Sequence, residues 1–115
     1  MENKQSVLRE RAEEMMTYKD DPAGLLDLYY RVGHDIMIIS DDMNNQLDLI
    51  RHIKKDKMPE YKSVAQFDRA IEQTVEYTGI KKSKITIDAF GKVLQVIKKK
   101  LEGFQSEIFN KDINF

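Results

Sequence analysis

The stretch that decides the fold is Asp21–Lys57, DPAGLLDLYYRVGHDIMIISDDMNNQLDLIRHIKKDK. Apolar residues recur along it in steps of three or four, which is the period of an α-helix. They are Leu25, Leu28, Tyr29, Val32, Ile36, Ile39, Met43, Leu47, Ile50 and Ile53. Asp21 suits the N-cap, and Pro22 suits the first helical position, where its missing N–H costs no hydrogen bond. We therefore expect a helix over 22–57, about 50 Å long.

Two features of this helix bear on its continuity and its neighbours. A break near Ser40 is the alternative, since serine is a natural helix cap. The apolar steps stay in phase across Ser40, which favours one continuous helix. Leu26, Tyr30 and Met37 widen the apolar stripe toward a second face. A helix that is apolar on more than one face needs more than one neighbour.

Shorter helices are expected on both sides of the long one. The segment 5–19 carries only a thin apolar stripe, so its helix depends on a neighbour or a partner. After the turn at Pro59, Ser63 and Gln66 have the spacing of a capping box, which starts a helix over 63–78. Either the long helix protrudes from the bundle, or the helix over 5–19 folds back to cover its first half.

A fourth helix is expected over 86–108. Thr86 reads as its N-cap, and the flanking Ile85 and Phe90 have the spacing of a hydrophobic staple. The residues between the third and fourth helices are expected to form a link, and the tail 109–115 is expected to fray.

These segments predict an all-α fold, a small bundle of three to four helices with one long central helix, as a single domain of residues 1–115. The chain has only two prolines and five glycines, and 41% of its residues are hydrophobic. Few helix breakers favour helices, and this hydrophobic content is enough for a core. Cysteine is absent, which excludes disulfides and thiolate metal sites.

Metal and catalytic patterns are weak. Asp48 and His52 share one helix face, but the only other histidine is His34, and the Glu-x-x-His pattern of di-iron bundles is absent. The EF-hand-like start at 42–46 fails where glycine and glutamate are required, at Leu47 and Ile53. We expect no metal, no cofactor and no enzymatic activity.

One segment points to nucleic acid. Residues 71–90 resemble the twenty-residue core of a helix-turn-helix motif, with Gly79 at the turn and Ile85 at an apolar position of the second helix. Val75 and Asp88 depart from the pattern, and a plain pair of helices is the alternative. The lysines that would contact phosphate are Lys81, Lys82, Lys84, Lys98, Lys99 and Lys100. If the second and fourth helices run parallel, Lys98–Lys100 approach the basic end 51–57 of the long helix.

The leading expectation is a non-enzymatic interaction or assembly protein that acts through amphipathic helix surfaces. Its partner would be a second copy, giving a homodimer, or another helical protein. The expected interface residues are Tyr29, Tyr30, Ile36, Met37 and Ile39. A regulator associated with nucleic acid is the alternative.

The expected location is the cytoplasm, because no apolar run in the sequence has the length of a signal-peptide core or a membrane span. Lysine outnumbers arginine and isoleucine outnumbers leucine, a bias of AT-rich genomes that favours a bacterial, phage or mobile-element origin.

Overall fold

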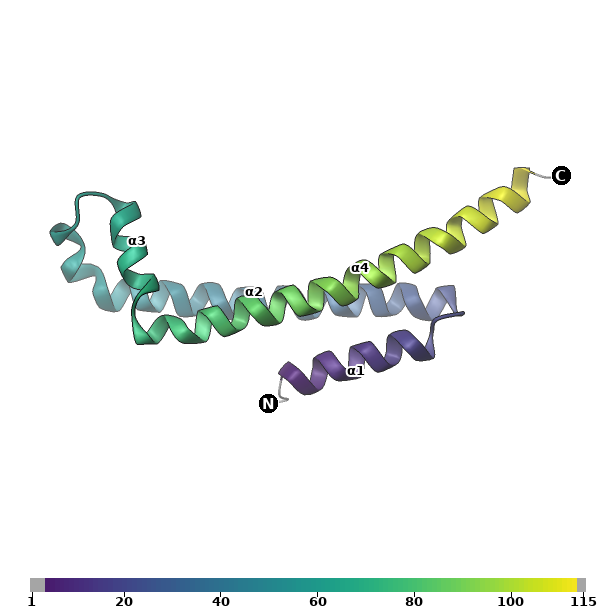
Figure 1. Ribbon diagram of the computed structural model, residues 1–115, viewed down its shortest axis with the longest axis horizontal. Helices are drawn as coiled ribbons and strands as arrows, with labels where there is room; N and C mark the ends of the chain where they lie inside the picture. Colours follow the sequence, from purple (N-terminus) through teal and green to yellow (C-terminus); the bar gives the residue numbers. More distant parts are fainter. Residues whose placement is uncertain (1–3, 114–115) are drawn as a thin grey trace. The chain divides into compact units, whose positions relative to one another are not determined.

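The computed structural model describes the backbone of residues 4–113 and the side chains of residues 4–104. This part of the chain is helical and contains no strand, which confirms the all-α fold class. Its α-helices are α1 (Lys4–Thr17), α2 (Pro22–Lys54), α3 (Val64–Glu72) and α4 (Thr78–Ile113) (Figure 1). Two 3₁₀ turns, η1 (Lys55–Glu60) and η2 (Val75–Tyr77), flank α3.

The long helix α2 is continuous through Ser40, as its unbroken apolar period predicts. The last residues of the predicted span, 55–57, belong to η1 instead of α2. Pro59 lies within η1, and a proline disfavours α-helical backbone in the residue before it. Most of the predicted stripe faces the interior, with Leu25, Leu28, Val32, Ile39 and Ile50 buried. Ile53, the last member of the stripe, is exposed.

The helix α3 begins as predicted and ends early. The Ser63 hydroxyl accepts a hydrogen bond from the Gln66 backbone N–H at 3.2 Å, while the Gln66 side chain accepts one from the Lys62 N–H. The expected end at 78 is wrong, since α3 stops at Glu72. There the backbone N–H and the hydroxyl of Thr74 both donate to the Ile71 carbonyl. These local bonds occupy the acceptor that the next turn of helix would use.

The start of α4 corrects the sequence prediction most strongly. The helix begins at Thr78, so the expected link is helical and Thr86 is not an N-cap but a buried residue inside the helix. The staple is also wrong, because Ile85 is exposed while Phe90 is buried. Buried positions recur in steps of three or four at Tyr77, Ile80, Ser83, Thr86 and Phe90. Two of these core positions therefore carry hydroxyl residues, so the helical period of buried residues in α4 cannot be recognised from apolar residues alone.

At its other end α4 reaches Ile113, five residues beyond the predicted end at 108. The tail expected to fray is thus helical as far as Ile113, and residues 114–115 lie outside the described part of the chain.

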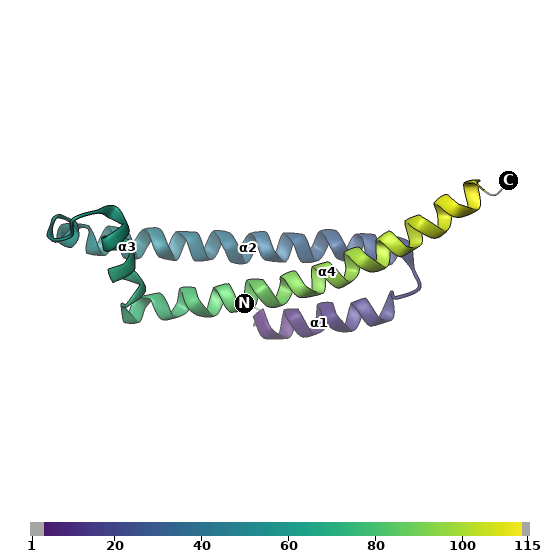
Figure 2. The ribbon, with the colours of Figure 1, turned by 45° about the horizontal axis from the view of Figure 1, so that its top comes forward.

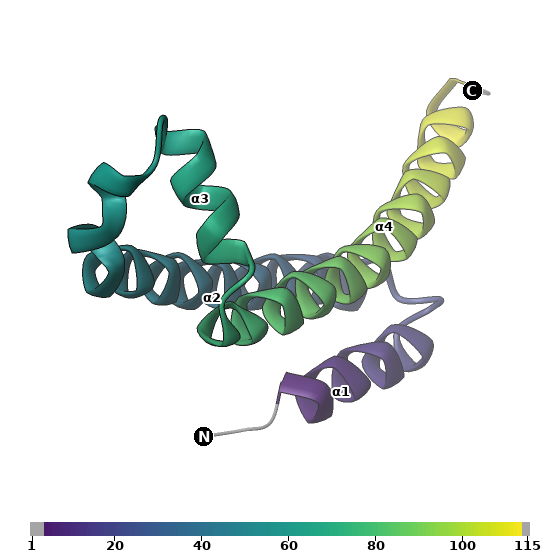
Figure 3. The same ribbon diagram turned by 60° about the vertical axis from the view of Figure 1, so that its left-hand side comes forward.

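Contacts divide the chain into two compact units. The first joins the residues up to Met37 with those from Thr86 onward, and the second is Ile38–Ile85. In each unit α2 and α4 pack against one another in opposite directions (Figures 2 and 3). Both helices continue from one unit into the other, so the prediction of a single domain stays a prediction.

In the first unit α1 folds back on α2. The core there is built from α2 and α4, with Leu25, Leu28, Val32, Phe90 and Ile97 fully or almost fully buried. The thin stripe of α1 contributes no buried residue. Its members Leu8, Ala12 and Met15 are half-buried. Ion pairs also link α1 to α2, joining Arg11 to Asp35 at 2.7 Å and Glu14 to Arg31 at 2.9 Å.

The second unit has its own core between the end of α2, α3 and the start of α4. Its buried members are Ile50, Phe67, Ile71, Tyr77 and Ile80. Met43, Leu47 and Tyr61 are partly buried and pack against this cluster.

Candidate interaction surface

An apolar line runs along the outward side of α2 in the first unit. It consists of Leu26, Tyr30, Gly33 and Met37, and we call it the outer seam. The spacing of four, three and four residues keeps these positions on one side of a helix. Leu26 is 46% exposed, Tyr30 67% and Met37 55%. A Cβ atom built on Gly33 would meet nothing within 4 Å, so the space above the middle of the outer seam is open.

The outer seam carries no charged residue, and its flank is electrostatically balanced. On that flank the Arg31 guanidinium donates to the Asp27 carboxylate at 2.9 Å. The ring of Tyr30 meets the ring of its neighbour Tyr29 edge-on, with centroids 5.9 Å apart. This contact restricts the ring of Tyr30 in the unpaired chain. The outer seam therefore presents a partly ordered apolar surface.

The predicted interface residues are only partly on this surface. Tyr30 and Met37 are exposed, while Tyr29 and Ile36 are half-buried. Ile39 is 4% exposed and belongs to the core, so it is not part of the outer seam. Ile39 lies seven residues after Val32, which places it on the core side of the helix.

Two members of the outer seam were missed by the interface prediction. Leu26 was read only as a widening of the stripe, and Gly33 was not used at all. The spacing of Leu26, Tyr30, Gly33 and Met37 is visible in the sequence. This spacing reveals a second face of α2 only when Gly33 is counted as one of its members.

The helix-turn-helix register over residues 71–90 is wrong. The bend between α3 and α4 falls at residues 73–77, whereas Gly79 lies in the first turn of α4. Ile85, which the motif requires as an apolar packing residue, is 69% exposed. Residues 71–90 therefore have no second helix starting after Gly79.

The predicted phosphate-binding lysines are divided between the two units. Lys84 donates to the Tyr77 hydroxyl at 2.8 Å, and this hydrogen bond raises the pKa of Lys84. Lys81 and Lys82 are exposed. Lys98 and Lys99 are exposed and Lys100 half-buried, all in the first unit, whereas the basic end of α2 lies in the second. Because α2 and α4 run antiparallel, the condition for bringing these clusters to one end is not met.

The described part of the chain also bears on metal binding and membrane insertion. It contains no group of three or more side chains that could hold a metal ion. None of its helices is long and apolar enough to span a membrane.

Comparisons with protein-family models, with curated proteins and with solved structures give no match. The surfaces of the chain itself are helical and include several exposed apolar side chains.

Proposed function

We propose that this chain acts in the cytoplasm as a non-enzymatic assembly protein that pairs with a second copy of itself through the outer seam of α2. The observation that carries the proposal is the exposure of Leu26, Tyr30 and Met37 along one uncharged line. Contiguous exposed apolar surface of this kind usually marks an interaction site.

The shape of the outer seam supports a second copy as the partner. Leu26 and Met37 are its ends, and Tyr30 and Gly33 are its middle. When two such lines meet in opposite directions, each Tyr30 faces the open space above the other copy's Gly33, and each Leu26 faces the other copy's Met37. A large residue then meets a small one at the centre of a two-fold interface.

The charges beside the outer seam are compatible with this antiparallel pairing. The register places Asp27 of one copy opposite Ile36 of the other, so no like charge faces Asp27. Asp27 is already paired with Arg31 within its own chain. Burial of the outer seam therefore leaves Asp27 paired, whereas burial of an unpaired charge would be costly.

The mass of the protein in solution tests the proposal. Light scattering should give about twice 13.5 kDa. Tyr30→Lys together with Met37→Lys should give a helical monomer, because both lysines would be buried in the apolar interface. Met16→Lys is the matched control, since Met16 is a 60% exposed methionine on α1. A wild-type monomer at high micromolar concentration would reject self-pairing, as would a double variant that stays dimeric.

A substitution at Gly33 distinguishes pairing in the proposed register from nonspecific hydrophobic association. Leucine has the higher helix propensity, so Gly33→Leu should stabilise the isolated helix while filling the open space that receives Tyr30. We expect the dimer to weaken by about tenfold, which corresponds to about 1.4 kcal/mol. Dimerisation that is unchanged or tighter in Gly33→Leu, measured by sedimentation, would contradict the proposed register.

The nucleic-acid alternative now rests on the lysines alone, since the helix-turn-helix register that suggested it is wrong. No arrangement of the described lysines favours it over self-pairing.

A further inference from the structure

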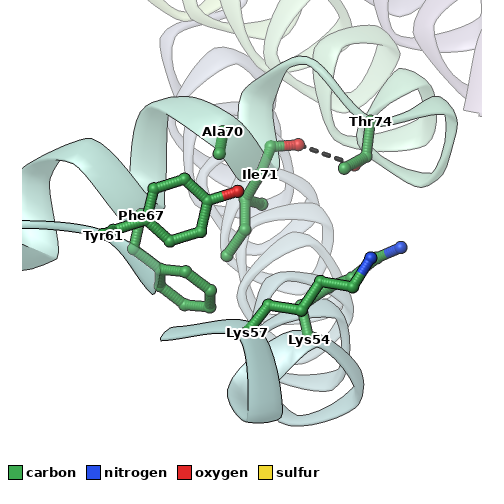
Figure 4. A pocket seen from close by; sticks show the side chains of 7 residues that line it. All are labelled: Lys54, Lys57, Tyr61, Phe67, Ala70, Ile71 and Thr74. Atoms are coloured by element: carbon green, nitrogen blue, oxygen red, sulfur yellow. Dashed lines mark hydrogen bonds between the residues drawn. The ribbon is translucent and has the colours of Figure 1, made fainter. Parts of the chain in front are cut away.

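The second unit contains a small cavity between α3 and the end of α2 (Figure 4). Its volume is about 100 Å³. The side chains that line it are Lys54, Lys57, Tyr61, Phe67, Ala70, Ile71 and Thr74. Apolar groups from α3 form one wall, and the two lysines extend along the other side (Figure 4). The cavity thus combines an apolar interior with a cationic rim.

The two lysines differ in whether a carboxylate of the same chain pairs with them. Lys54 lies 3.6 Å from the Glu76 carboxylate. The pKa of Glu76 is lowered by its own backbone N–H and then by Lys54, so Glu76 is charged at neutral pH. Lys57 has no ion-pair partner among the described residues. No carboxylate lines the cavity, which leaves a net positive rim.

The hydroxyl groups at the cavity are partly committed. The Thr74 hydroxyl donates to the Ile71 carbonyl at 2.6 Å, so its proton is not available to a ligand. The Tyr61 ring packs against Phe67 with centroids 5.7 Å apart, on the apolar side of the cavity (Figure 4). An anion at the rim would therefore be met by Lys57, with Lys54 on the same side of the cavity.

From this combination we infer that the cavity binds a small organic anion, a monocarboxylate on a short apolar chain. An apolar cavity of about 150 Å³ can hold benzene, so about 100 Å³ suits a chain of roughly three or four carbons. The chain would contact Phe67, Ala70 and Ile71 while the carboxylate faces Lys57. Inorganic phosphate fits less well, because its inner oxygens would be buried against apolar groups without donors.

Titration with sodium isobutyrate, followed by the amide NMR signals of the full chain, tests the inference. We expect saturable shifts at residues 67–74, with a dissociation constant on the order of 10 mM for so small a ligand. Isobutyramide has the same shape without the charge and should give no saturation over the same range. Saturable binding of the amide, or no saturable shift with isobutyrate, would overturn the inference.

Three variants locate the binding site. Lys57→Gln should weaken binding about threefold or more, the loss expected for one partly exposed charge pair. Ala70→Leu should fill the cavity and abolish binding, and circular dichroism should show that its helices remain. Lys55→Gln is the matched control, because Lys55 is a neighbouring exposed lysine that does not line this cavity. Binding that survives Ala70→Leu, or that Lys55→Gln weakens as much as Lys57→Gln, would contradict the site. These outcomes do not depend on whether the outer seam forms a dimer.

Discussion

At the residue scale, two glycines differ in whether the surrounding atoms leave room for a side chain. A Cβ atom on Gly24 would lie 2.6 Å from Cδ1 of Tyr18, whereas one on Gly91 would meet nothing within 4 Å. Gly24→Ala should therefore destabilise the protein by about 1–3 kcal/mol through overpacking. Gly91→Ala should stabilise it by about 0.5–1 kcal/mol by lowering the entropy lost on folding. Urea unfolding of both variants checks the pair, and equal effects would refute the close packing of Tyr18 on Gly24.

A second residue-scale prediction concerns the polar attachment of α1. The Arg11 guanidinium donates to both oxygens of Asp35, and both side chains are largely shielded from solvent. Arg11→Gln should cost about 1–2 kcal/mol, since a shielded charged hydrogen bond is lost. Amide hydrogen exchange in this variant should become faster in α1, with a smaller change in α2. Arg9→Gln, at an exposed position of the same helix, should have no such effect, and equal exchange in the two variants would contradict this account of α1.

At the element scale, the sequence predicts helices well where apolar periods and caps agree. The continuous α2 and the Ser63 cap of α3 were both predictable for this reason. The start of α4 was not, because Ser83 and Thr86 look like capping residues but occupy buried positions of a helix already under way. A hydroxyl residue has the same sequence signature in both roles, and only the neighbouring helix decides between them.

A proline at residue 82 tests the continuity of α4. Inside a helix, proline removes a hydrogen bond and clashes with the preceding turn, so Lys82→Pro should cost about 3 kcal/mol or more. In a link between helices it would be tolerated. Lys82→Ala removes the same lysine and its side-chain interactions without the backbone effect, so it should cost clearly less than Lys82→Pro. Thermal unfolding of the two variants decides, and a stable Lys82→Pro protein would show that residues 79–85 are not helical.

At the scale of the whole molecule, the candidate surface was half predictable. Tyr30 and Met37 stand out as apolar residues beside the main stripe of α2. Ile39 could have been separated from them, because its position seven residues after Val32 places it on the core side of α2. Gly33 was missed because a glycine has no hydropathy to contribute. Its meaning comes from the open space above it.

The central claim is antiparallel pairing of two copies through the outer seam, and disulfide trapping tests it most directly. The chain has no cysteine, so single cysteines can be introduced cleanly. The register places Leu26 of one copy against Met37 of the other, and a disulfide requires the two Cα atoms to lie within about 7 Å. Leu26→Cys and Met37→Cys proteins, mixed before mild oxidation, should form a cross-linked dimer, and neither should cross-link alone. Cross-linking of either variant with itself, or none in the mixture, would contradict the account.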